Sequence, residues 1–345
     1  MTPNTKISMP QLAGMKILFI GGSGFVGKAI VQHLLSLGCD LTLLNRGSHI
    51  INNTKQLIAD RNSEAEVMSL AKSQLHRFDG VVDTSSYSRD QTKIMWDAFS
   101  QKTDRWIHLS SASVYKDVVT APPKEKDETG GADIWGDYGR KKSAADAFLG
   151  EQTHGPSITI FRPPYIYGPG NNLDRETFVW SRMLQDRPVV IPANDRVRIQ
   201  FVHIDDLSAA VTAALGDHRR RQCTAYNIGA DEQLTFREYV SGLASVVGTA
   251  GKTIYVEYSG AEYKARQYFP FRDYPCWANT DFIKDDLPWT PAKNFLNGFN
   301  ETFSFYDRHK LAHASLDTNI EDRILCSAPI TPPKHTKGHK HECIK

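Results

Sequence analysis

Short apolar runs alternate with amphipathic stretches through the first half of the chain. The first run, 17–20, passes through a glycine turn into a helix-forming stretch at 28–37. The pattern then predicts strands at 41–44, 56–59, 78–83, 106–110 and 157–162, and helices at 64–75, 92–102 and 138–149. Repeated strand–helix units give parallel strands joined by right-handed crossovers. The predicted fold class is therefore α/β, with a doubly wound, Rossmann-type parallel sheet.

The pattern changes after Pro169. Helices are predicted at 175–185, 207–215 and 235–247, and short strands at 188–191, 201–204 and 225–228. These segments predict a smaller, partly discontinuous α/β lobe that binds the substrate beside the sheet. The domain that contains the sheet is expected to comprise residues 15–170 and about 198–230, and the lobe residues 171–197 and about 231–312.

Both ends of the chain lack this periodicity. Residues 1–14 are polar and predict a flexible leader without the apolar stretch of a secretory signal. Residues 313–345 predict a disordered tail, since their last part is rich in Pro, Lys and His. Four residues in this tail have side chains that can bind metals: His335, His339, His341 and Cys343. Because no folded scaffold is predicted to hold them in tetrahedral geometry, we expect a solvated tail and assign no metal.

Composition removes several classes of function. The net charge of +2, from 41 basic and 39 acidic residues, gives no overall field that attracts nucleic acid or an anionic membrane. No apolar run approaches the roughly 20 residues needed to span a bilayer, so no membrane partner is expected. The five cysteines are scattered without a C-x-x-C pair, which fits free thiols and a cytoplasmic location.

Three glycines follow the first strand at spacings of three. Gly21 permits a tight turn, Gly24 leaves room for a pyrophosphate, and Gly27 lets the helix pack closely on the strand. The helix end adds free N–H groups and a partial positive charge. A glycine-rich turn can also occur without a ligand, but this strand–turn–helix context predicts a dinucleotide site.

A tyrosine, a lysine and a serine are candidates for chemistry. Tyr138 and Lys142 are four residues apart, and therefore lie on one face of the predicted helix. A nearby ammonium lowers the pKa of a phenol from about 10 and prepares it for acid–base work. Ser111 follows a predicted strand at the edge where parallel sheets bind ligands. Alone, each could be structural: an incidental surface pair and a serine cap on a turn.

In combination these motifs resemble the short-chain dehydrogenase/reductase superfamily. Its extended, NAD-dependent epimerase/dehydratase-like branch is matched by several further stretches in the right order, which are Ser-Ser-Ala-Ser-Val-Tyr (110–115), Arg-Pro-Pro-Tyr-Ile-Tyr-Gly-Pro (162–169), Phe-Val-His-Ile-Asp-Asp-Leu (201–207) and Asp-Leu-Pro-Trp-Thr-Pro (286–291). The resemblance covers about residues 15–310.

The resemblance implies a role for each matched residue. Tyr138 would be the proton donor and acceptor, Lys142 would lower its pKa and bind the nicotinamide ribose, and Ser111 would be the catalytic serine. The remaining cofactor-binding residues would be Gly21, Gly24, Phe25, Val26 and Gly27 at the pyrophosphate, Asn45, Arg46 and Asp60 towards the adenosine, and Tyr165 near the nicotinamide. A homodimer is common among such relatives, and the oligomeric state stays open.

The second predicted strand bears on the form of the cofactor. An acidic residue at its end would hydrogen-bond the ribose 2′-hydroxyl of NAD. This strand instead ends Leu44-Asn45-Arg46, and Arg46 can pair with a 2′-phosphate. The sequence therefore favours NADP(H). NAD(H) remains the alternative if Arg46 stacks on the adenine or points into water.

Departures from the family's motifs bear on the substrate. Ala112 and Ser113 stand where nucleotide-sugar dehydratases carry an Asp-Glu pair, which disfavours 4,6-dehydration. Ile199 and Phe269 stand where relatives that bind nucleotide diphosphates offer arginines, with Arg272 displaced from the second position. The expected substrate is therefore a sugar-like or other small polar molecule rather than specifically a nucleotide sugar.

Two functions from different classes remain after these comparisons of motifs. The first is an NAD(P)(H)-dependent oxidoreductase or epimerase that transfers hydride at a carbinol or carbonyl carbon, with tyrosine as general acid/base. Whether the oxidised intermediate leaves or is reduced again on its other face is open. The alternative is a Rossmann-fold protein that binds RNA or regulates a partner and uses the dinucleotide as a sensor. The basic run 219–221 is the sequence feature in its favour.

Overall fold

Seven strands form the main sheet in the structure, a computed structural model that describes residues 12–47, 50–257 and 262–327. The strands are β1 (Lys16–Ile20), β2 (Asp40–Asn45), β3 (Lys55–Ile58), β4 (Gly80–Asp83), β5 (Arg105–Leu109), β6 (Ser157–Arg162) and β10 (Cys223–Asn227). All neighbours run parallel, in the order β10-β6-β5-β4-β1-β2-β3. The order reverses between β1 and β4, where open α/β sheets bind their ligands.

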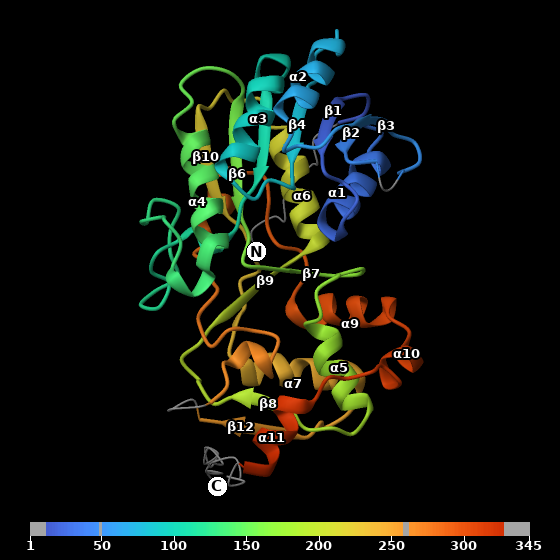
Figure 1. Cartoon of the computed structure of the whole chain (residues 1–345), viewed down its shortest axis with the longest axis vertical. Coiled ribbons are helices and arrows are strands. Elements are labelled where there is room, and N and C mark those ends of the chain that lie inside the picture. The colour runs from blue at the N-terminus through green and yellow to red at the C-terminus, as the bar shows by residue number, and fades with distance from the viewer. Residues whose placement is uncertain (1–11, 48–49, 258–261, 328–345) are drawn as a thin grey trace, which may run out of the picture.

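Helices cover both faces of this sheet (Figure 1). They are α1 (Phe25–Ser36) and α6 (Ile204–Leu215) on one face, and α2 (Glu64–Ser73), α3 (Arg89–Phe99) and α4 (Gly136–Gly150) on the other. Successive residues of a strand face opposite ways, so Phe19 packs in the α1 cluster and Leu18 in the α3 cluster. The predicted doubly wound α/β fold is confirmed.

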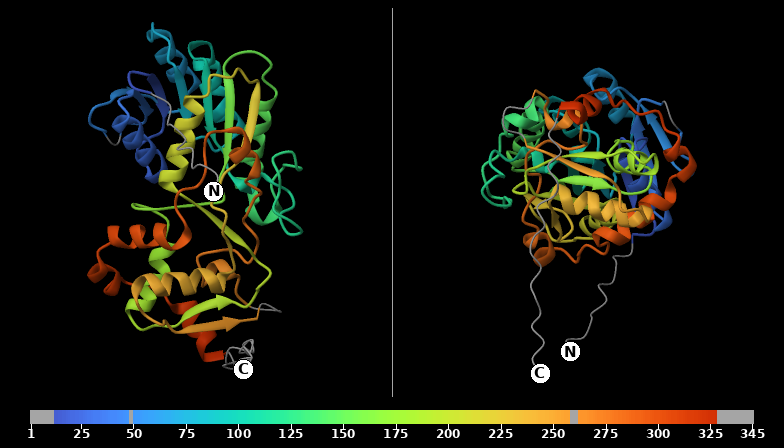
Figure 2. Two further views of the ribbon diagram at one scale, coloured as in Figure 1. Left: turned by 180° about the vertical axis from the view of Figure 1, so that it is seen from behind. Right: turned by 90° about the horizontal axis from the view of Figure 1, so that it is seen from below.

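A smaller lobe lies beyond the carboxyl ends of these strands (Figures 1 and 2). Its strands are β7 (Tyr165–Tyr167), β9 (Ile199–His203) and β11 (Gln233–Leu234) in one sheet, and β8 (Val189–Pro192) and β12 (Thr253–Val256) in another. Its helices are α5 (Glu176–Leu184), α7 (Phe236–Val247), α9 (Phe295–Phe305), α10 (Arg308–Ala312) and α11 (Asn319–Ser327). Stacked aromatic rings fill its core, such as Tyr167 on Phe299 with centroids 4.2 Å apart.

One segment assigned to the lobe from the sequence returns to the main sheet. Helix α8 (Asp281–Asp286) packs beside β10, and Tyr226 donates a hydrogen bond to Asp286. Trp289 is buried in the α1–α6 core and donates its indole N–H to the Asp206 carbonyl at 2.8 Å. The assignment of the whole of 231–312 to the lobe is therefore wrong for this stretch, because its apolar residues complete the sheet's core.

The expectation of a disordered tail from residue 313 is also wrong for its first part. Helix α11 packs on the lobe, where the guanidinium of Arg182 and the carboxylate of Glu321 form an ion pair buried on both sides. At the other end of the chain, Leu12 is buried, so part of the expected leader is folded. Residues 1–11 and 328–345, including His335, His339, His341 and Cys343, lie outside the described residues.

The described part of the chain contains no helix that is long and apolar enough to cross a membrane. Four cysteines fall within it, and all are free thiols: Cys39, Cys223, Cys276 and Cys326.

Candidate active site

The glycine turn after β1 opens onto a cavity of about 380 Å³, the central cavity. Gly21 has a φ of +107°, which side chains disfavour. A Cβ on Gly27 would lie 2.7 Å from the Gly22 nitrogen, so only glycine allows α1 to approach the turn this closely. A Cβ on Gly24 would meet nothing within 4 Å, and Phe25 and Val26 complete this wall. The turn therefore leaves open space directly at the amino end of α1.

The amino end of α1 is suited to an anion. Gly24 caps the helix without a side-chain hydrogen bond, and the first turn has no acidic residue. Its free N–H groups and the helix dipole favour negative charge. These residues fit a dinucleotide pyrophosphate.

A second hollow, the outer cavity, continues from the central cavity along the ends of β2 and β3. The expected adenosine-side residues Asn45, Arg46 and Asp60 all line it. Arg46 is exposed and forms no ion pair with any described residue. Arg61, which the sequence reasoning missed, lines the same hollow and pairs with buried Asp83 at 2.9 Å. The outer cavity thus carries the guanidinium of Arg46, which has no ion-pair partner among the described residues, and the carboxylate of Asp60.

Ser111 and Tyr138 meet on the opposite side of the central cavity. Ser111 follows β5 and caps a short 3-10 turn, accepting a hydrogen bond from the Ser113 main-chain N–H at 3.2 Å. Tyr138 lies on the first turn of α4 and lines the same cavities as Ser111, which acts on its phenol. Burial around the phenol raises its pKa, whereas the Ser111 hydrogen bond and the charge of Arg175 act to lower it. Burial outweighs these two groups, so the pKa of Tyr138 is raised above its usual value.

Lys142 lies one turn further along α4 and also lines the central cavity. It donates hydrogen bonds to the main-chain carbonyls of Ser86 at 2.6 Å and Leu109 at 2.7 Å. Burial lowers its pKa to about 8. The groups that act most on the phenol in this structure do not include Lys142, and its expected role in lowering the pKa of Tyr138 stays a prediction. Helical spacing puts the two residues on one face, but it does not determine which groups the ammonium of Lys142 hydrogen-bonds.

A third hollow of about 390 Å³, the lobe cavity, begins at Ser111 and Tyr138 and runs into the smaller lobe. Tyr165 lines this cavity and not the central one. Its ring packs 4.7 Å from that of Phe271 and under the Arg175 guanidinium. Tyr165 therefore shares this cavity with Ser111 and Tyr138, and its expected place near the nicotinamide stays a prediction.

Several lining residues were not singled out from the sequence. Thr84, Ser85 and Tyr87 follow β4, and Tyr87 borders all three cavities. Their place was foreseeable, since β4 adjoins β1 at the point where the strand order reverses. Arg175 borders the central and lobe cavities, and nothing in its sequence neighbourhood signals this.

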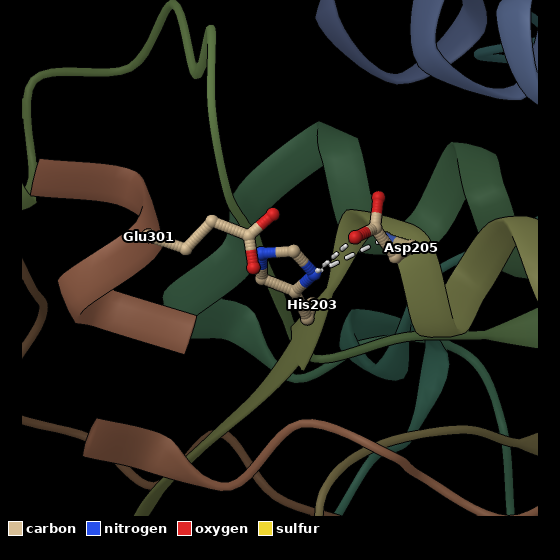
Figure 3. A group of neighbouring side chains, drawn as sticks. All are labelled: His203, Asp205 and Glu301. Atoms are coloured by element: carbon tan, nitrogen blue, oxygen red, sulfur yellow. Dashed lines mark hydrogen bonds and ion pairs between the residues drawn. The ribbon is translucent and has the colours of Figure 1, made fainter. Parts of the chain in front are cut away.

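One cluster away from these cavities resembles a metal site. His203, Asp205 and Glu301 bring potential ligand atoms within 4.8 Å of one another, with the imidazole between the two carboxylates (Figure 3). The Nδ1 of His203 accepts a hydrogen bond from the Asp205 main-chain N–H. The ammonium of Lys293 lies 3.6 Å from Asp205 and also pairs with Glu301. Because Lys293 already supplies the positive charge, we assign no metal here.

Comparison with known proteins places this site in context. The model of the NAD dependent epimerase/dehydratase family matches residues 17–229. A relative named chloroplast stem-loop binding protein of 41 kDa b, from Arabidopsis thaliana, is 27% identical over 330 residues, which cover 90% of this chain and 84% of that protein.

Solved structures share the fold at low sequence identity. UDP-glucose 4-epimerase from Thermotoga maritima, with UDP-glucose, has a TM-score of 0.69 at 18% identity and covers 84% of this chain and 98% of that one. dTDP-glucose 4,6-dehydratase from Bacillus anthracis, in complex with NAD, has a TM-score of 0.70 at 17% identity, over 86% of this chain and 98% of that one. The matched span contains the parallel sheet, the glycine turn, Ser111 and Tyr138. The chain belongs to the NAD dependent epimerase/dehydratase family.

Proposed function

We propose that the chain is an NAD(P)(H)-dependent oxidoreductase or epimerase acting on a carbinol or carbonyl carbon of a small polar, sugar-like substrate. The observation that carries this proposal is the placement of Ser111 and Tyr138 together where the central and lobe cavities meet. The glycine turn supports a dinucleotide in the central cavity, and the lobe cavity leaves space for a substrate. A nicotinamide bound there would supply or accept the hydride.

The residues of the chain would handle the proton and hold the oxygen. In the reducing direction, Tyr138 gives its phenolic proton to the carbonyl oxygen as the carbon gains hydride, and in the oxidising direction it takes that proton back. Ser111 donates a hydrogen bond that positions the same oxygen. The positive charge of Arg175 favours the phenolate, although burial raises the pKa of Tyr138 overall.

Two finer assignments follow from the cavity walls. Arg46 in the outer cavity supports NADP(H), since an unpaired guanidinium suits a 2′-phosphate. None of the described residues that line the lobe cavity is acidic, and Ala112 and Ser113 follow Ser111 directly. An elimination that needs a carboxylate base is therefore disfavoured, whereas epimerisation and reduction both remain.

The test is Tyr138→Phe, which removes only the proton-transferring oxygen. Turnover of NADPH with a panel of aldoses and ketoses is expected to fall by about 1,000-fold, while NADPH titrated by fluorescence binds as before. Tyr255→Phe, on β12 in the smaller lobe, is the matched control and keeps full activity. Normal turnover by Tyr138→Phe would overturn the proposal.

The alternative, RNA binding, is favoured by one observation: the relative named as a stem-loop binding protein aligns with most of this chain. The basic run adds little support. Arg219 and Arg221 both pair with Asp217 and Asp286, which neutralise their charge. An affinity for stem-loop RNA that weakens with salt and survives Tyr138→Phe would favour this function.

A further inference from the structure

Two small hollows lie at the edge of the main sheet opposite the central cavity. This edge is formed by the amino ends of β5, β6 and β10, which face away from the smaller lobe (Figure 1). The hollows have volumes of about 180 and 250 Å³ and share two residues, Gly155 and Arg220. Their walls come from residues 152–157, where α4 leads into β6, and from residues 217–222 between α6 and β10. Together the two hollows form the basal site.

A glycine keeps the space between the two hollows open. Gly155 has a φ of +115°, a backbone conformation that side chains disfavour. A Cβ at this position would lie 3.4 Å from the Cζ2 atom of Trp96, whose indole is buried. The ring of Trp96 therefore lies directly behind the residue that both hollows share.

Two arginines of the basal site have no acidic partner among the described residues. Arg220, the middle residue of the basic run 219–221, is exposed and forms no ion pair there. Arg105 donates hydrogen bonds to the main-chain carbonyl of Asp217 at 3.1 Å and to the Nδ1 of His218 at 2.7 Å. The His218 nitrogen must accept this bond, because a guanidinium has no acceptor atom. Uncharged groups thus orient Arg105 without neutralising it.

Both carboxylates that line the smaller hollow already have arginine partners. Asp217 lies 2.8 Å from the guanidinium of Arg219, and Asp104 lies 2.8 Å from that of Arg77. None of the described residues that line the larger hollow is acidic. The two unpaired guanidinium groups are therefore left without a counterion at this edge of the sheet, and a bound anion would supply one.

The donors on these walls favour a phosphoryl group as the anion. Each guanidinium presents a planar fork of N–H donors that matches the oxygens of phosphate. Further side chains that can donate hydrogen bonds line the larger hollow: Gln152, Thr153, His154 and Gln222. Both hollows are smaller than the roughly 300–1,000 Å³ of sites that enclose a drug-sized ligand. The basal site therefore suits one phosphoryl group, with the rest of the molecule that carries it in solvent.

We propose that the basal site binds a phosphoryl group through Arg105 and Arg220, at the opposite edge of the sheet from the proposed reaction. The inference does not rest on the proposed function, since neither arginine lines the central, outer or lobe cavity. The phosphoryl group can belong to a small phosphate ester or to the backbone of a nucleic acid. In both cases the two guanidinium groups bind its oxygens.

The experiment records fluorine NMR spectra of the whole chain, labelled with fluorotryptophan, as inorganic phosphate is added. The signal of Trp96 reports on the basal site, and Trp96→Phe assigns it. Phosphate should shift this signal, and Arg105→Gln and Arg220→Gln should each weaken the binding about tenfold, while circular dichroism checks that both variants remain folded. The matched control is Arg237→Gln on α7 in the smaller lobe, which should leave the phosphate affinity read at Trp96 unchanged.

The outcomes separate the two sources of the phosphoryl group. A single-stranded oligouridylate that binds through the same arginines at least about tenfold more tightly than inorganic phosphate supports a nucleic-acid backbone. A smaller preference supports a small phosphate ester. A Trp96 signal that moves with neither phosphate nor the oligonucleotide overturns the inference. Unchanged affinity in both arginine variants, or acetate that binds as tightly as phosphate, overturns it as well.

Discussion

The two cavities that meet at Tyr138 are built in different ways. The wall of the central cavity at the glycine turn comes from one continuous stretch of backbone, 21–27, and presents main-chain N–H groups. The lobe cavity takes its charge from Arg175, Arg266 and Arg272, which are far apart in sequence. The central cavity would bind its ligand through a local backbone turn. The lobe cavity would bind its ligand through side chains that come together only when the lobe folds.

This difference indicates how the site divides its tasks. A backbone turn that requires glycine constrains the sequence strongly and suits a cofactor shared by many proteins of one fold. A wall made of side chains can change residue by residue without disturbing the sheet, and this suits the selection of a substrate. Damage to one wall should therefore leave binding at the other intact, and each of the following changes tests that separation.

The largest effect is expected from Glu321→Ala, which should destabilise the smaller lobe without changing the main sheet. It would leave the guanidinium of Arg182 buried without a partner, a loss of about 3–5 kcal/mol in the free energy of unfolding. Urea unfolding followed by circular dichroism measures this. The control is Asp322→Ala, which breaks the exposed pair with Arg187 and should cost about 0–1 kcal/mol. Equal effects of the two variants would show that α11 does not support the lobe.

A smaller effect, confined to the central cavity, is expected from Gly24→Val. Its φ of −88° suits any residue, so the fold should persist while the side chain fills the space at the amino end of α1. Affinity for NADPH should fall by at least about 100-fold, or about 2.7 kcal/mol, in a fluorescence titration. The control is Gly150→Val at the carboxyl end of α4, where a Cβ also meets open space. This variant should bind NADPH normally. Undiminished NADPH binding in Gly24→Val would show that the cofactor does not bind in this cavity.

The smallest effect should come from Arg46→Gln in the outer cavity. If Arg46 holds a 2′-phosphate, affinity for NADPH falls about tenfold, or about 1.4 kcal/mol, while affinity for NADH is unchanged. Isothermal titration of both cofactors gives the ratio. Arg77→Gln, whose partner Asp104 lies on the protein surface, is the control. A parallel loss for NADH and NADPH would contradict the preference for the phosphorylated cofactor.

Much of the main sheet could be predicted because its signals are local. The apolar runs and the glycine turn predict parallel strands and crossover helices. The bounds of the observed strands differ from the predicted bounds by only a few residues. The C-terminal helix escaped prediction since its stability depends on burying Glu321 against Arg182, 139 positions earlier in the chain. Trp289 likewise returns to the main core from within the segment assigned to the lobe.

The sequence by itself determined the α/β sheet, the turn at Gly24 that is suited to an anion, and the presence of Ser111 and Tyr138 at one edge of the sheet. These follow from short-range periodicity and from the rule that parallel strands end on the same side. Only the tertiary structure decided that the Lys142 ammonium bonds to carbonyls, that Tyr165 faces the lobe, and that three arginines share one cavity. Such contacts join segments whose separation in sequence carries no local signal, because they form only when packing brings those segments together.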